Sequence, residues 1–312
     1  MTPAIIDQLL RPMVKSIAPY RSARDEFEDF EAQKIFLDAN ENPFGDGINR
    51  YPDPLQRKLK RALAKVKGVQ PEQILLGNGS DEVLDLIFRT FCEPGAEEVL
   101  LLPPTYGMYG VLAKLNNIQI KEVPLNQDFL PDINGILTAV SATTKIIFVC
   151  SPNNPSGNAV PLELIKTLLD GFNGIVVVDE AYVDFSEEES ALSLLKDYPQ
   201  LLVCQTFSKA YGLAGIRLGM CFAHPSVIDY FNKIKPPYNV NALSQEQALA
   251  RLADYKTVQE QVGLLIEERK KLDIALIKFD FIVKIYPSDA NFLLMVVDDA
   301  GKRYNQFLAA GV

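Results

Sequence analysis

Short apolar, β-branched runs alternate with helical patterns along most of this chain, and this alternation limits the possible folds more than any other feature. We predict strands at 97–102, 118–123, 145–150, 174–178, 201–205 and 217–223. We predict helices between most of them, at 81–92, 106–116, 161–170 and 190–197. Such alternation is typical of an α/β fold with a mostly parallel sheet covered by helices on both faces. Ligands of such sheets bind at the carboxyl ends of the strands.

The pattern changes after about residue 225. A long helical stretch, broken at most once, covers 241–278, and two short strands follow at 281–286 and 292–297. We therefore predict a smaller α+β domain after the large one. The predicted parts are an N-terminal segment (1–45) that packs on the small domain, a large domain (46–225) and a small domain (226–312). The final residues, FLAAGV, read as a helix, a turn and the start of another strand, so the small sheet is expected to be incomplete.

The chain is acidic, with a formal net charge of −9. This disfavours a broad nucleic-acid interface, and no nucleic-acid partner is expected. The basic stretch RKLKRALAKVK (57–67) is interpreted as the solvated face of a helix. No apolar run reaches the ~18 residues of a membrane helix, and Asp7 and Gln8 interrupt the apolar N-terminus. We expect a cytoplasmic protein with no membrane partner.

The positions of the cysteines and of the single histidine limit which disulfides, metal sites and catalytic bases are possible. None of the cysteines lies in a C-x-x-C pair, and we predict four buried free thiols, Cys92, Cys150, Cys204 and Cys221. The single histidine, His224, precedes Pro225 at a strand-to-helix turn and is interpreted as structural. A metal site with two histidines is impossible, and no metal site is predicted. The catalytic base is therefore expected to be another residue type.

Polar clusters follow several of the predicted strands, and one leads into the predicted helix at 81–92. They are GNGSDE (77–82), PPTYGMY (103–109), SPNNPSG (151–157), VVVDEAYVDF (176–185) and TFSKAYGLAGIRLG (206–219). The first four clusters each have a structural reading when taken alone: a helix cap, core packing, a tight turn and a salt bridge, respectively. Their common position at strand ends favours one shared ligand site.

The chemistry of these clusters is complementary. The helix start at Ser80 offers free N–H groups to an anion, and Arg217 could clamp a phosphate. Asp179 follows three valines, so its carboxylate is expected to be buried and to need a cationic partner. Lys209 follows a buried strand, and a desolvated lysine could attack a carbonyl as a neutral amine. Tyr106 could present a flat face to a planar ligand.

Together these groups describe one ligand. It has a phosphate, a flat ring, a basic ring nitrogen, an aldehyde and, for Asn154 and Tyr182 to bind, a phenolic oxygen. Pyridoxal 5′-phosphate (PLP) has all five features, and such a site needs no histidine.

Several motifs resemble those of a known family. In their order, SPNNPSG, DEAY and SKAYGLAGIRLG resemble fold type I PLP-dependent aminotransferases. LDANENPFG, RYPDP, GNGSDE, PPTYGMY and FCEPG are similar to the histidinol-phosphate aminotransferases of the class II subfamily. The resemblance implies the PLP transferase fold type I and a homodimer with shared active sites. It also implies, for histidine biosynthesis, that L-histidinol phosphate and 2-oxoglutarate become imidazole acetol phosphate and L-glutamate.

The resemblance also implies roles for matching residues. The catalytic residues would be Lys209, which holds PLP and moves a proton, Asp179, which pairs with the pyridine nitrogen, and Tyr182. The remaining cofactor-binding residues would be Ser80, Asp81, Glu82, Tyr106, Asn154, Thr206, Ser208, Arg217 and, across the dimer, Tyr51. Substrate would meet Tyr20, Asn40 and Asn291. The family also uses an arginine in a later strand to bind substrate, and this sequence stops before that strand.

Other readings stay open. An aromatic aminotransferase or a phospho-amino-acid decarboxylase of the same fold shares every cofactor motif. A decarboxylase would release carbon dioxide and form no glutamate. A PLP-binding regulator usually carries a DNA-binding segment, for which this acidic chain has no room. A nucleotide-phosphate-binding module built on GNGSDE leaves Lys209, Asp179 and Asn154 unexplained.

Overall fold

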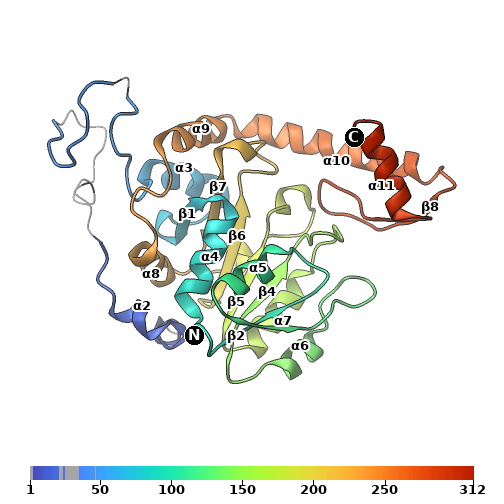
Figure 1. Ribbon diagram of the computed structural model, residues 1–312, viewed down its shortest axis with the longest axis horizontal. Coiled ribbons are helices and arrows are strands. Elements are labelled where there is room, and N and C mark those ends of the chain that lie inside the picture. Colours follow the sequence, from blue (N-terminus) through green and yellow to red (C-terminus); the bar gives the residue numbers. More distant parts are fainter. Residues whose placement is uncertain (1–2, 21–23, 25–34, 46) are drawn as a thin grey trace.

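The computed structural model describes residues 3–20, 24, 35–45 and 47–312, and Figure 1 shows a large sheet between layers of helices. The sheet has seven strands in the order β1-β7-β6-β5-β4-β2-β3. These are β1 (Ile74–Asn78), β2 (Glu98–Leu101), β3 (Gln119–Glu122), β4 (Thr144–Cys150), β5 (Ile175–Asp179), β6 (Leu201–Thr206) and β7 (Leu218–Phe222). The predicted α/β fold class and the six predicted strands are confirmed.

Strand β7 breaks the parallel order of the sheet. It is antiparallel to both β6 and β1, whereas the described pairs from β6 to β3 are parallel. Only residues 207–217 connect β6 to β7, and a parallel crossover needs a dozen or more residues. The chain therefore turns back beside β6. The strand pattern does not predict β1, because its apolar run, Ile74–Leu76, is short and is followed by Gly77.

The core lies on both faces of this sheet. In β5, Ile175 and Val177 belong to one apolar cluster, and Val176 and Val178 belong to the other. Successive side chains of a strand point to opposite faces. A continuous run of valines therefore needs apolar helices on both sides.

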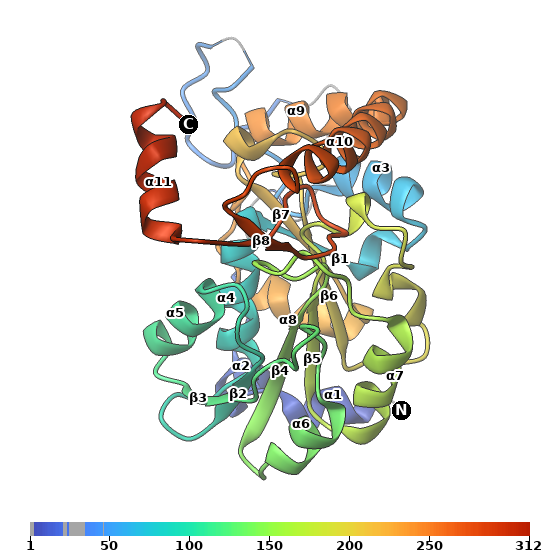
Figure 2. The same ribbon diagram turned by 90° about the vertical axis from the view of Figure 1, so that its right-hand side faces the viewer.

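Two sets of helices provide this cover, and Figure 2 shows α4 and α5 on one side of the strands and α7 on the other. The first set is α4 (Gly79–Phe91), α5 (Met108–Leu115) and α8 (Pro225–Ile234). The second set is α3 (Arg57–Lys67), α6 (Ile133–Ala139), α7 (Leu162–Gly171) and α9 (Ala242–Ala253). Both sets pack apolar side chains on the sheet, as the sequence pattern predicts.

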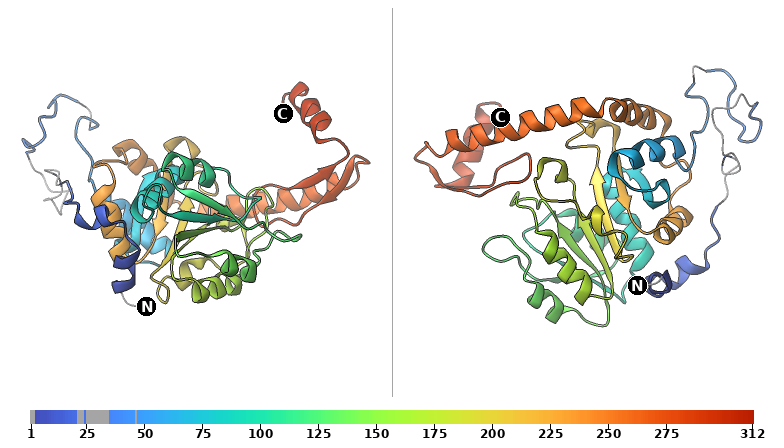
Figure 3. Two further views of the ribbon diagram at one scale, coloured as in Figure 1. Left: turned by 60° about the horizontal axis from the view of Figure 1, so that its bottom comes forward. Right: turned by 180° about the vertical axis from the view of Figure 1, so that it is seen from behind.

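A smaller α+β part follows. Helix α10 (Tyr255–Leu276) leads to the antiparallel strands β8 (Ile282–Ile285) and β9 (Met295–Val297), and α11 (Ala300–Ala309) comes last. Figure 3 shows α10 running beyond the large sheet toward α11. The predicted helix break lies at Asp254, between α9 and α10. The elements of this part are confirmed.

Two short N-terminal helices pack against α8. Helices α1 (Pro3–Leu9) and α2 (Pro12–Ser16) contact α8, and Ile6, Leu10 and Val14 join the core beneath α4 and α8. The backbone N–H of Arg11 donates to the carbonyl of Thr90 at 3.0 Å. The apolar side chains of α1 and α2 therefore complete the core on the face of the large sheet that α4 and α8 cover.

Two local expectations are corrected. The predicted helix at 190–197 is only the 3₁₀ turn η4 (Ala191–Leu194), because Pro199 and the start of β6 leave little room for a longer helix. The helix at 57–67 forms as α3, but its face is not wholly solvated, since Lys60 is buried.

The predictions for the cysteines and for His224 are confirmed. All four cysteines are buried free thiols. His224 is structural: its Nδ1 accepts the N–H of Ser226 at 3.3 Å and caps α8. Among the described residues, no helix combines the length and the apolar character that crossing a membrane requires.

Gly219 in β7 provides a test of this packing. A β-carbon at this position would clash with the backbone of Ser80 and lie 2.6 Å from the carbonyl oxygen of Gly79. Gly219→Ala is therefore expected to lower the free energy of unfolding by about 2 kcal/mol or more, measured by urea denaturation. The control is Gly263→Ala in α10, where the new β-carbon meets nothing within 4 Å and should stabilise the helix by up to about 1 kcal/mol. Equal stability of the two variants would contradict this packing.

Candidate active site

A cavity of about 210 Å³ lies at the carboxyl ends of β4, β5 and β6, beside the start of α4. This is the edge at which ligands of α/β sheets bind. Among the residues that line it are the predicted cofactor-binding residues Ser80, Asp81, Tyr106, Asn154, Asp179, Tyr182, Thr206, Ser208, Lys209 and Arg217. The fold thus brings together residues that lie up to 137 positions apart in the chain (217 minus 80).

The carboxylate of Asp179 forms the buried wall of this cavity. Asp179 ends β5 and is 4% exposed. It accepts hydrogen bonds from the hydroxyl of Tyr109 at 2.7 Å and from the N–H of Ala181 at 3.1 Å. Burial raises its pKa, although these hydrogen bonds and the charge of Lys209 act in the opposite direction. Among the described residues no lysine or arginine forms an ion pair with it.

Tyr109 is a site residue that the sequence analysis does not identify. It is fully buried in α5, and its ring stacks on Phe148 with centroids 4.9 Å apart. Tyr106, three residues earlier, meets it edge-on at 5.5 Å and lines the cavity. The sequence could have identified Tyr109 through its spacing from Tyr106 in PPTYGMY, because residues three apart at a helix start lie on the same face.

The lining of the cavity near the start of α4 has the features of an anion site. The N-cap of α4, Asn78, makes no side-chain cap, so the first N–H groups lack that partner. Thr206, Ser208 and Arg217 line the same cavity. The guanidinium of Arg217 lies 3.5 Å from the carboxylate of Asp81 and is 55% exposed. Free helix N–H groups, hydroxyls and a guanidinium are donors that bind a phosphate well.

A backbone hydrogen bond fixes the main chain of Arg217 next to the start of α4. Its carbonyl accepts the N–H of Gly79 at 2.9 Å, and its own φ is +51°, in the left-handed region. The side chain therefore leaves the chain just where β7 begins, next to the start of α4.

Lys209 projects into this cavity from the loop after β6. Its Nζ lies 5.3 Å from the centroid of the Tyr182 ring. Lys209 is exposed in this chain, so the condition of desolvation is not fulfilled by the chain alone. The reason is that β6 ends at Thr206, and the loop directs the lysine toward the open cavity and not into the core.

The two asparagines of SPNNPSG have different positions. Asn153 is buried; its Nδ2 donates to the Ser156 hydroxyl at 2.7 Å and to the carbonyl of Pro104 at 3.0 Å. These bonds join the loop to the segment before α5. They leave Asn154 on the cavity wall.

Some predicted residues lie outside this cavity. Glu82 accepts the N–H of Asn78 at 2.6 Å and the Nδ2 of Asn239 at 3.0 Å, and its side chain does not line the site. Tyr20 and Asn291 are exposed and line neither this cavity nor the one described next. The predicted grouping of these residues with the cofactor site is therefore not seen within one chain.

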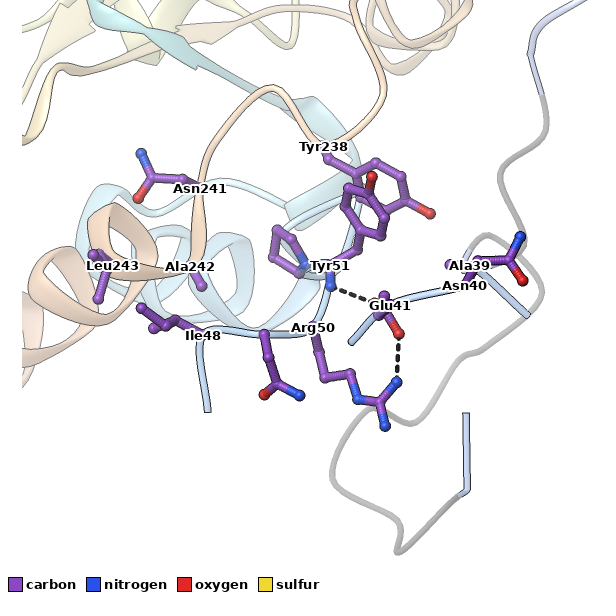
Figure 4. A pocket seen from close by; sticks show the side chains of 12 residues that line it. Ala39, Asn40, Glu41, Ile48, Arg50, Tyr51, Tyr238, Asn241, Ala242 and Leu243 are labelled. Carbon is purple, nitrogen blue, oxygen red and sulfur yellow. Dashed lines mark hydrogen bonds and ion pairs between the residues drawn. The ribbon is translucent and has the colours of Figure 1, made fainter. Parts of the chain in front are cut away.

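Tyr51 and Asn40 line a second cavity of about 600 Å³ (Figure 4). The Tyr51 ring stacks on Tyr238 with centroids 4.5 Å apart. Glu41 accepts the N–H of Tyr51 at 2.6 Å and an N–H of Arg50 at 2.8 Å. Figure 4 shows these groups beside the connection to α9.

The arrangement favours chemistry on a small anionic ligand. It combines a lysine amine, a buried carboxylate and an anion site in one cavity. Within the described ranges, no group of three or more histidine, cysteine, aspartate or glutamate side chains is placed to hold a metal ion.

Comparisons with known proteins agree with this chemistry. The curated histidinol-phosphate aminotransferase of Flavobacterium johnsoniae is 56% identical over 308 residues, which cover 98% of this chain and 88% of that protein. The solved histidinol-phosphate aminotransferase of Sinorhizobium meliloti, in complex with pyridoxal-5′-phosphate, has a TM-score of 0.74 at 28% identity and covers 86% of this chain and 76% of that one. The L-threonine-O-3-phosphate decarboxylase of Porphyromonas gingivalis has a TM-score of 0.70 at 26% identity over 81% of this chain and 75% of its own.

The family described as Aminotransferase class I and II matches residues 26–308. This match covers most of the 312 residues. The chain therefore belongs to the class I and II aminotransferases.

Proposed function

We propose that this enzyme is a PLP-dependent aminotransferase that exchanges the amino group between L-histidinol phosphate and 2-oxoglutarate, in histidine biosynthesis. The observation that carries the proposal is one cavity that holds Lys209, buried Asp179 and the anion site. The relative at 56% identity, named a histidinol-phosphate aminotransferase, supports the choice of substrate.

The residues present fit PLP. Asp179 is a buried carboxylate that lacks a cationic partner among the described residues, and a protonated ring nitrogen would supply one. The start of α4, Thr206, Ser208 and Arg217 would hold the phosphate. Further contacts are proposed for Tyr106 with the ring face and for Asn154 and Tyr182 with the ring oxygen. When bound, PLP supplies an electron sink for negative charge that develops on the substrate carbon.

We propose that Lys209 both holds the cofactor and acts as the acid–base group. Its Nζ would accept the proton from the substrate carbon that carries the amino group, and it would return a proton later in the exchange. The single histidine lies at the start of α8, away from the lining of this cavity, so it is not available for this role.

A homodimer with shared sites would complete the cavity. Arg217 and Lys209 are open to solvent in one chain, and Tyr51 is half-exposed in a different cavity. We infer that Tyr51 of a second copy approaches the anion site. We propose that Glu82 supports the cofactor site indirectly, because its carboxylate accepts the N–H of Asn78 and so fixes the start of α4. Tyr20, Asn40 and Asn291 remain the proposed substrate contacts.

We also propose the division of the chain into a segment at 1–45, a large domain at 46–225 and a small domain at 226–312. Helix α8 begins at this second boundary, at Pro225, and it packs on β1 of the large sheet. The four buried free thiols support a reducing, cytoplasmic location.

The proposed function is tested by measuring the glutamate and the carbon dioxide that the enzyme forms. With L-histidinol phosphate and 2-oxoglutarate, the purified enzyme loaded with PLP is expected to form glutamate in equal amount to the donor consumed, without carbon dioxide. The second candidate is a phospho-amino-acid decarboxylase, which the similar fold of the Porphyromonas gingivalis enzyme favours. Carbon dioxide from O-phosphothreonine, with no glutamate formed, would replace our proposal with that one.

Lys209→Ala tests the acid–base role. We expect kcat to fall by about a thousandfold or more, because removing the group that moves the proton usually removes several orders of magnitude. The melting temperature should be unchanged within about 3 °C, since the side chain is exposed. Lys196→Ala, another exposed lysine, is the matched control and should retain full activity. Comparable activity of the two variants would refute the role.

Tyr109→Phe tests the hydrogen bond to Asp179. That bond lowers the pKa of Asp179, so its loss should raise the pKa further and favour the neutral acid. The acidic limb of the kcat–pH profile is expected to move to higher pH, with kcat lowered about tenfold. In the control, Tyr198→Phe removes a surface hydrogen bond to Asp170 of 2.9 Å and should leave the profile unchanged. A profile of Tyr109→Phe that overlies the wild type would show that the bond does not tune Asp179.

A further inference from the structure

A separate cavity of about 360 Å³ lies between α3, the 3₁₀ turn η2 (Pro71–Gln73) and α8. Lys60 and Arg61 of α3, Glu72 of η2, and Asp229 and Asn232 of α8 line it. It shares no lining residue with the active-site cavity. Nothing in the proposed reaction uses these side chains.

Lys60 is the unusual member of this cavity. It is 6% exposed, and among the described residues its ammonium has neither a hydrogen bond nor an ion pair. Burial lowers its pKa to about 7, and the nearby charge of Lys235 adds to this effect. The charges of Asp53 and Glu72 act in the opposite direction but do not restore the usual value. A buried lysine that lacks a counter-charge tends to lose its proton, and a bound anion would restore the charged form.

The neighbouring charged groups do not supply this partner. Arg57 is paired with Asp53 at 2.6 Å. The ammonium of Lys235 donates to the carbonyl of Pro54 at 2.9 Å and to Asn239 at 3.3 Å. Glu72 and Asp229 are exposed, so water screens their charge.

A second group in the same cavity is also unsatisfied. The Oδ1 of Asn232 is buried, and no hydrogen-bond donor reaches it from the part of the chain that the structure describes. Lys60 and Asn232 therefore line the same cavity, and each has a polar group that lacks a partner among the described residues.

We propose that this cavity is a binding site for hydrogen phosphate, which accepts hydrogen bonds from Lys60 and donates its own hydroxyl to Asn232. An oxyanion that keeps a proton near neutral pH supplies both an acceptor and a donor. Sulfate has the same shape but no proton at this pH, so it cannot satisfy Asn232. Exposed Arg61 adds positive charge at the cavity and favours the anion.

The test is competitive chemical labelling of Lys60 in the enzyme loaded with PLP. Trace acetic anhydride at pH 7 transfers an acetyl group to a neutral amine, with release of acetate and a proton, and peptide mass spectrometry reports each lysine. Bound phosphate should raise the pKa of Lys60 by about one unit or more and slow its labelling about fivefold at saturation. Sulfate at equal ionic strength should slow it much less. Lys65, exposed on the same helix and outside this cavity, serves as the internal control.

The result is specific to this cavity, because phosphate at the active site would not protect Lys60. Asn232→Leu should reduce protection by phosphate to the level seen with sulfate. In equilibrium dialysis, Lys60→Met should lose one bound phosphate per chain, whereas Lys65→Met should lose none. Unchanged labelling of Lys60 in millimolar phosphate would overturn the site, and equal protection by sulfate would overturn the assignment of a proton-bearing oxyanion.

Discussion

The buried carboxylate of Asp179 is the interaction on which the rest of the active site depends. It lies at the end of β5, where apolar side chains from both faces of the sheet fix the strand. Tyr109 and Ala181 hold its oxygens, but no described cation neutralises it. Such a carboxylate is stable when a positively charged ligand nitrogen completes it, and the cavity opens beside it. The apolar sheet therefore determines where the chemistry takes place.

The anion site depends on a different constraint, the reversal of β7. Because β7 runs antiparallel to β6, its first residues lie beside the last residues of β6 and the start of α4. Gly219 allows α4 to approach without a clash, and Gly79, at φ +76°, begins the helix next to Arg217. A phosphate group at this point would meet helix N–H groups, hydroxyls and a guanidinium together.

The active-site cavity and the cavity beside Lys60 each have a buried ionisable group in their lining, and the two groups carry opposite charges. In one, a buried carboxylate, Asp179, lacks a cation; in the other, a buried ammonium, Lys60, lacks an anion. A folded chain stabilises such groups poorly by itself, and this is the basis on which we propose a ligand for each. The difference lies in the sequence signal. Asp179 follows a run of valines, whereas Lys60 lies within a basic helix whose pattern suggests solvent exposure.

The sequence by itself determined the α/β class, six of the seven strands of the large sheet, and the motifs that meet at the strand ends. These features follow from local periodicity and from residue chemistry, and both can be read from residues that are close together in the sequence. Only the tertiary structure decided the direction of β7, the hydrogen bond of Tyr109, the exposure of Lys209 and the burial of Lys60. Each of these depends on which distant segment packs against a residue, and Tyr109 and Asp179 are 70 positions apart. Local pattern carries no information about such contacts, because the packing energy that fixes them arises only when the whole sheet has formed.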